Sequence, residues 1–282
     1  MAAVPQAQRS PSSAPGPTSP RRTAAAASRL CQEGVALLPR PFGHPDAVRR
    51  AAQRISRQAD RRSPLGVRFG RLELVGEFVI PPPLAATRDF QALHFDFGRP
   101  LDPRGARDVA RFTALHIPHD HGPVEARTRL VRLDQALRQR RWAQPGELIR
   151  RFERYGMSHG AWDAERGYSE GIFARLVEAA DDREPVLPSV SATPGFLCGT
   201  EFASAGDERR FFEDHGLSLD EAETVVALQP GELLVFDNLA WAHGRRGRRR
   251  PGELHQWMFG YRALSASRQR VVRRQLLEAF AP

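Results

Sequence analysis

The chain has 282 residues, a length that suits one large domain or two small ones, and 41% of them are hydrophobic, enough for a sizeable core. Its formal net charge is +9, and all 42 basic residues are arginine. A coding bias toward GC-rich codons explains why the basic residues are arginine and not lysine, so nucleic acid is not expected as a partner. The positive net charge is still compatible with acidic ligands. No apolar run reaches 18 residues and no signal-peptide core is present, so we predict a cytoplasmic protein without a membrane span.

The first 28 residues differ in composition from the rest of the chain. They are rich in Ala, Pro, Ser and Arg, and the first acidic residue is Glu33. Such a segment buries little apolar surface, so residues 1–28 are predicted to form a disordered tail. An organelle transit peptide has a similar composition, but this segment lacks a clear amphipathic pattern. Residues 29–282 are predicted to form a single domain, and its oligomeric state is left open.

Helical and strand-like patterns alternate along this domain. Residues 46–61 have the pattern of an amphipathic helix, and the other helix-like segments are 128–140, 146–155, 168–180 and 207–215. Strand-like segments are 67–80, 89–97, 108–117, 224–228, 232–236 and 254–261, with shorter pieces in 187–202. Many short strands with a helical insert at about 128–182 predict a mostly β protein with added helices, either a β-sandwich or a jelly roll.

Two motifs far apart in the chain carry residues that bind metals. His94-Phe95-Asp96 lies in an apolar strand-like run, and residues i and i+2 of a strand share a face about 6.6 Å apart. The second motif is an apolar strand, 231–238, followed closely by His243. Two histidines and one carboxylate on one face suit non-haem Fe(II) and leave coordination positions open.

These motifs resemble those of the Fe(II)/2-oxoglutarate-dependent oxygenases, especially the taurine dioxygenase and clavaminate synthase-like branch. His243 lies 147 residues beyond Asp96, a separation similar to that of this branch. The resemblance covers roughly residues 65–265. It implies a double-stranded β-helix (jelly roll), iron bound by His94, Asp96 and His243, and 2-oxoglutarate and O₂ as cosubstrates.

The resemblance also implies a chemistry. 2-Oxoglutarate is decarboxylated oxidatively to succinate and CO₂, and a C–H bond of a small substrate is hydroxylated. A small polar molecule is expected, namely an amino acid, a derivative or a natural-product intermediate, and this expectation rests on analogy. Halogenases of the wider family have Gly or Ala in place of the carboxylate, so Asp96 argues against halogenation.

One feature departs from the family. Its members usually place an arginine 10 to 15 residues after the distal histidine, where it pairs with the far carboxylate of 2-oxoglutarate. Residues 253–258 contain no arginine here. Arg250 is the first choice for this role, with Arg249 beside it, Arg262 beyond the window and His255 as a weaker cationic donor. The family threonine that contacts 2-oxoglutarate is matched to Thr128, with Thr113 as the alternative.

Other interpretations remain open at this point. The segment 116–121 holds three histidines and is a competing metal site, although its proline and the following Gly122-Pro123 indicate a loop. Asp237-Asn238 is expected to fix the turn before His243, or to orient a ligand. Alternative functions are a nucleic-acid-binding or repair protein, suggested by the charge, and a cupin-like protein that binds Zn²⁺ without redox chemistry.

Overall fold

The computed structural model describes residues 20–39, 44–79, 90–94, 107–121, 124–132, 162–163, 168–169, 205–214, 218–250, 252–265, 267–268 and 271. Its larger antiparallel sheet has the order β1 (Val35–Leu38), β9 (Leu233–Asp237), β4 (Arg107–His116), β11 (His255–Leu264) and β2 (Glu73–Val79). Its smaller antiparallel sheet has the order β3 (Phe90–His94), β10 (Ala242–Arg246), β5 (Arg127–Val131) and β8 (Glu223–Val226). β6 (Trp162–Asp163) pairs with β7 (Tyr168–Ser169).

The described helices are α1 (Pro20–Glu33), α2 (Pro45–Asp60), α3 (Pro64–Phe69), α8 (Ala205–Asp214) and α9 (Leu219–Ala222). The prediction of a mostly β protein with added helices is therefore confirmed. Within the described part of the chain, no helix is long and apolar enough to cross a membrane.

The two larger sheets pack against each other through apolar side chains. Leu115 of β4 and both Leu234 and Phe236 of β9 form one buried cluster with Leu130 of β5. Because side chains alternate along a strand, these residues define the inner face of each sheet. Burying side chains of this size contributes roughly 1.5–3 kcal/mol each.

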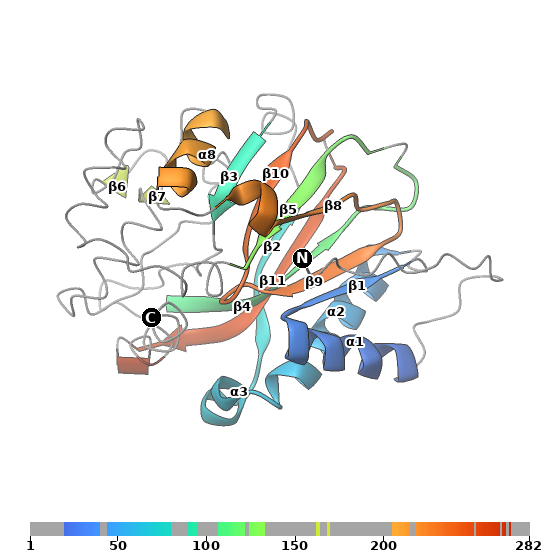
Figure 1. Ribbon diagram of the computed structural model, residues 1–282. Helices are drawn as coiled ribbons and strands as arrows, with labels where there is room; N and C mark the ends of the chain where they lie inside the picture. The colour runs from blue at the N-terminus through green and yellow to red at the C-terminus, as the bar shows by residue number, and fades with distance from the viewer. Residues whose placement is uncertain are drawn as a thin grey trace.

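Helices α1 and α2 cover the outer face of the larger sheet, and Figure 1 shows them beside β1 and β9, away from β3 and β10. The face of α2 that was predicted to be apolar is buried, since Val48, Ala51, Ala52 and Ile55 have no exposed surface. The helix begins after His44, whose ring accepts a hydrogen bond from the Asp46 amide, and Pro45 stands in its first turn. The helix predicted at 46–61 is confirmed.

Helix α1 includes the last nine residues of the predicted tail. The helix contains a run of alanines, and alanine has the highest helix propensity of any residue type. Thr23, Ala27 and Leu30 are buried on the side that packs against α2 and β1. Burial of these side chains against α2 and β1 stabilises the helix, and the composition of the segment does not reveal this burial. Residues 1–19 lie outside the described residues.

Residues 128–131 form a strand, so the helix predicted from Thr128 is wrong over this stretch. β5 lies between β10 and β8, and both neighbours hydrogen-bond to it. Pairing on both edges outweighs the local helical pattern, because backbone groups on both sides of Thr128–Val131 find partners in neighbouring strands. Tyr168–Ser169 also pairs as a strand rather than starting a helix. The predicted helix at 146–155, most of that at 168–180 and the strand pieces at 187–202 lie outside the described residues.

A buried ion cluster joins α8 to the smaller sheet. Arg129 of β5 lies 2.6 Å from a Glu208 carboxylate oxygen and 2.9 Å from one of Glu223. The other Glu208 oxygen accepts the backbone N–H of Leu93 in β3, at 2.6 Å. Burial raises the pKa of Glu208, while Arg129 opposes that rise. β3 is an edge strand of its sheet, and this carboxylate satisfies a donor on its outer side.

The cluster gives a stability prediction with a control on the same helix. Glu208→Ala should lower the free energy of unfolding by about 3–5 kcal/mol, because it leaves buried charge and the Leu93 amide uncompensated. Arg209→Ala removes the exposed pair with Asp220 (2.8 Å) and should cost no more than about 1 kcal/mol. Urea denaturation of both variants measures the difference, and equal losses would contradict a structural role for the cluster.

Candidate functional site

The two predicted histidine positions lie on neighbouring strands. His243 of β10 is directly opposite His94 of β3 on one side and Leu130 of β5 on the other. The His243 side chain is 4% exposed, and its ring centroid lies 4.9 Å from that of Phe236 in the other sheet. His243 therefore faces the space between the two sheets. The side chain of His94 and all of Asp96 lie outside the described residues.

The register between β10 and β3 slips beside His243. His243 pairs with His94, whereas Arg245 pairs with Gln91, so β3 has one extra residue between these pairs. Such a bulge bends the strand and changes the direction of the residues next to it, and bulges are common beside functional sites. The bulge thus lies in the pairing of β3 with β10, the two strands that carry the predicted metal ligands His94 and His243.

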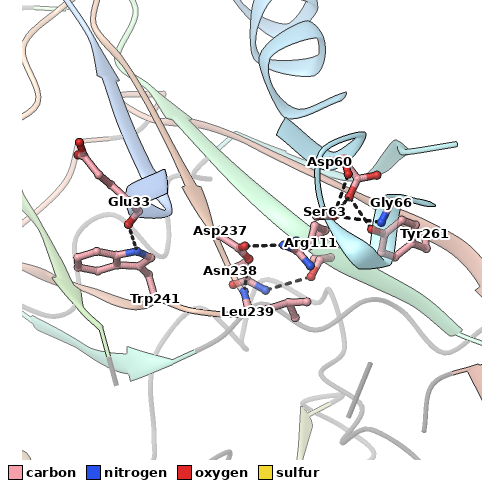
Figure 2. A network of polar contacts seen from close by, with 11 residues as sticks. Glu33, Asp60, Ser63, Gly66, Arg111, Asp237, Asn238, Leu239, Trp241 and Tyr261 are labelled. Carbon is pink, nitrogen blue, oxygen red and sulfur yellow. Dashed lines mark hydrogen bonds and ion pairs between the residues drawn. The ribbon is translucent and has the colours of Figure 1, made fainter. Parts of the chain in front are cut away.

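The turn that leads into β10 is held by side chains. Asp237 accepts the backbone N–H of Leu239 at 3.0 Å and an Arg111 guanidinium N–H at 2.8 Å, and Figure 2 shows these contacts together. The Asn238 amide donates to the backbone carbonyl of Ala110 at 3.3 Å. The expectation that Asp237-Asn238 fixes this turn is confirmed.

A second anchor ties the same turn to the end of α1. The Trp241 indole N–H donates to the Glu33 carbonyl at 3.1 Å (Figure 2). Gly34 adopts a positive φ of 74°, and a Cβ there would lie 2.6 Å from the Trp241 ring nitrogen. Only glycine fits both requirements. The segment just before His243 is therefore attached to two other elements of the fold.

A buried arginine lies near His243 on the inner side of the smaller sheet. Arg249 is 4% exposed, and its Nη2 donates to the Thr128 hydroxyl at 3.2 Å. Thr128 shares a face with Leu130, the residue opposite His243, and lies about 7 Å from it along the strand. Thr128 therefore belongs to the next pair on the same face as His243 and Leu130, and Arg249 contacts it.

The charges around Arg249 are only partly balanced. Its Nη1 lies 3.7 Å from Glu253 Oε1 and has no hydrogen-bond acceptor among the described residues. Burial lowers the pKa of Arg249 to about 10; Glu253 opposes this effect and Arg245 adds to it. Among the described residues, Glu253 is the one carboxylate within ion-pair distance of Arg249.

The structure favours Arg249 over Arg250 for the predicted anion-binding role. Arg250 is exposed, and its backbone N–H donates to Glu253 at 2.9 Å. Arg262 is also at the surface, where it pairs with Glu73 at 3.2 Å. Sequence reasoning could not separate Arg249 from its neighbours, because three successive arginines carry no periodic signal of burial.

His255 lies on the outer face of the larger sheet. It is directly opposite His116, and the two ring centroids are 6.4 Å apart. His116 follows Leu115, which faces inward, so alternation directs His116 and His255 to the other side. This placement is opposite to that of His243 and does not suit the predicted contact of His255 with 2-oxoglutarate.

The competing histidine segment has a structural role at its first residue. His116 is buried and its Nδ1 donates to the Glu232 carbonyl at 2.8 Å, while Trp257 stacks on its ring. His121 belongs to a turn closed by its N–H to the Pro118 carbonyl. Among the side chains that the structure describes, which include these histidines, no group of three or more His, Cys, Asp or Glu is arranged to hold a metal.

His116 gives a prediction for the pH dependence of stability. Burial lowers its pKa to about 4, from 6.5 for an exposed histidine. The unfolded chain takes up the proton first as the pH falls, so stability is complete above about pH 6.5 and is lost toward pH 4. Between pH 7.5 and 4.5, this group should account for a loss of about 2–3 kcal/mol.

Urea denaturation at the two pH values tests this expectation. In His116→Gln, the amide can still donate to Glu232 but does not titrate, so the pH-dependent loss should shrink by that amount. An identical loss in the variant and the wild type would show that other groups control acid unfolding.

No protein-family model and no curated protein sequence matches the chain. It is similar to the solved structures of PvcB from Pseudomonas aeruginosa (17% identity, TM-score 0.42, 83% of this chain and 79% of that chain) and of a taurine dioxygenase from Burkholderia xenovorans (14%, 0.40, 93% and 90%). It is also similar to asparagine oxygenase (14%, 0.41, 86% and 78%). A further PvcB structure bears the description of an Fe, alpha-ketoglutarate dependent oxygenase.

Proposed function

We propose that the chain is an Fe(II)- and 2-oxoglutarate-dependent oxygenase of the taurine dioxygenase-like branch, whose two packed sheets are the two sides of a jelly roll. The observation that carries the proposal is the register that sets His243 directly opposite His94, with His243 buried between the sheets. Directly opposite residues of antiparallel strands generally share a face, with Cβ atoms about 4.5–5.5 Å apart. This arrangement supports a shared metal site.

The donor set fits the metal. His94, Asp96 and His243 would supply two imidazoles and one carboxylate, which is the set that suits Fe(II) and leaves positions for other ligands. When bound, iron with 2-oxoglutarate and O₂ supplies the oxidation that hydroxylates a C–H bond and releases succinate and CO₂. Contact with the Phe236 ring holds the His243 side chain in one orientation and keeps water from one side of it.

Arg249 and Thr128 are the residues proposed to hold 2-oxoglutarate. A buried guanidinium that has one carboxylate at 3.7 Å and an Nη1 donor without a hydrogen-bond partner among the described residues would be stabilised by a second carboxylate. Thr128 keeps the guanidinium in place and adds a hydroxyl on the same face as Leu130. The substrate class, a small polar molecule such as an amino acid, a derivative or a natural-product intermediate, comes from the sequence resemblance.

The metal assignment is tested by replacing His243. His243→Ala should abolish succinate formation that depends on Fe(II), and with it the visible charge-transfer colour that Fe(II) and 2-oxoglutarate give without oxygen. His255→Ala is the matched control, because this histidine lies on the outer face and its loss should leave turnover within about twofold. A Zn²⁺ protein without redox chemistry would give no colour in the wild type. Full turnover in a folded His243→Ala protein would disprove the assignment.

The cosubstrate assignment is tested with neighbouring arginines. Arg249→Gln should raise the KM for 2-oxoglutarate roughly 10- to 100-fold, because a charge-assisted hydrogen bond contributes about 1.5–3 kcal/mol. Arg250→Gln removes the same charge one residue away at the surface and should change the KM little. Succinate release against 2-oxoglutarate concentration gives both values. A large effect of Arg250→Gln alone would return the role to Arg250.

A further inference from the structure

The net charge of the chain is concentrated in one segment. Residues 20–71 contain 12 of the 42 arginines but only 3 of the 33 acidic residues, so they carry nine excess positive charges. The remaining 30 arginines and 30 acidic residues cancel. Coding bias explains why the basic residues are arginine, but it acts along the whole gene and does not explain this separation.

The helices of this segment form the layer on the outer side of the larger sheet. α1, α2 and α3 all lie within it, on the side of β1 and β9 away from β10. One of its three acidic residues, Asp60, is buried and accepts the Tyr261 hydroxyl at 2.6 Å (Figure 2). Glu33 and Asp46 are therefore the only acidic residues of this segment that reach the surface.

Four arginines form a stripe along α2 and its C-terminal end. Arg50, Arg54, Arg57 and Arg61 are spaced by four, three and four residues, which places them on one side of a helix, opposite the buried face of Val48 and its neighbours. The stripe is about 16 Å long at 1.5 Å per residue. Among the described residues, Arg50, Arg54 and Arg61 have no carboxylate within ion-pair distance. Arg57 donates to the Leu72 carbonyl at 3.0 Å.

The second helix adds to the same basic surface. Arg22 and Arg29 of α1 are both exposed and are seven residues apart, on one side of that helix. Arg62, at the end of α2, donates to the Ser28 hydroxyl of α1 at 3.3 Å, so the two helices lie side by side there. The basic surface therefore extends from α2 onto α1.

The chemistry of the surface selects among polyanions. α1 and α2 expose no large hydrophobic side chain and contain no Phe, Tyr or Trp. A protein interface needs apolar or aromatic anchors at its centre, and proteins that bind single strands stack bases on aromatic rings. A helix that inserts into a bilayer uses its apolar face, which in α2 is buried against the sheet. Phosphates need only guanidinium groups, and a duplex presents roughly ten charges along the length of the stripe.

We infer that the outer face of α1 and α2 binds the phosphate backbone of double-stranded nucleic acid, on the side of the fold away from His243. The contact has no sequence preference, because phosphates carry none. The inference is independent of the proposed oxygenase activity.

Fluorescence anisotropy of a labelled 20-base-pair duplex with the full chain, between 50 and 200 mM salt, tests the inference. In the triple variant Arg50→Gln, Arg54→Gln and Arg61→Gln, the slope of log affinity against log salt concentration should become less steep by about 3, because each phosphate contact contributes about 0.9 to it. Over this salt range, its affinity should therefore fall about 40-fold less than that of the wild type. The single variant Arg54→Gln should flatten the plot by about 1.

The matched control removes the same charge elsewhere. Arg127→Gln, Arg132→Gln and Arg210→Gln together change residues of β5, the loop after it and α8, and should leave the slope unchanged. Equal effects of the two triple variants would overturn the inference, because only net charge would then matter. No duplex binding at 50 mM salt would also overturn it, as would binding to phosphatidylserine vesicles in preference to the duplex. Circular dichroism and thermal melting verify that each variant is folded.

Discussion

The pairing of β10 with a neighbour on each edge is the constraint on which the rest of the site depends. β3 and β5 fix the register of β10 from both sides, and His243 is the residue at which both registers meet opposite His94 and Leu130. A shift of one residue would turn His243 to the other face of the sheet. The turn held by Asp237, Asn238 and Trp241 prevents such a shift at the start of the strand.

The interior contains two kinds of buried arginine, and the difference between them is informative. Arg129 has two carboxylates within 2.9 Å, so its charge is compensated by the fold itself and it serves to hold β3, β5, β8 and α8 together. Arg249 has one carboxylate at 3.7 Å and an open donor beside Thr128. A buried cation whose charge is only partly balanced gains from binding an anion, and this is why we propose that the cosubstrate carboxylate binds at Arg249 rather than at Arg129.

The two sides of the larger sheet carry different charges and different roles. The inner side meets the smaller sheet, where His243, Thr128 and Arg249 gather. The outer side carries α1, α2 and α3, which belong to the segment 20–71 with its nine excess positive charges, and the apolar faces of α1 and α2 are buried in the core. Because the apolar face of α2 is buried, its exposed side chains are mainly arginine and other polar residues, and the layer suits an ionic partner.

The sequence alone determined the elements whose patterns are local. The alternation in 108–117 and 232–236 and the helical spacing in 46–61 depend on neighbouring residues, so these elements could be predicted. Tertiary structure decided what depends on distant partners. Residues 128–131 became a strand because β8 and β10 pair with them, and α1 formed because α2 and β1 bury one side of it. The burial of Arg249 among three successive arginines depends on its contact with the distant Thr128. The opposite faces of His243 and His255 follow from strand pairing that no local pattern contains.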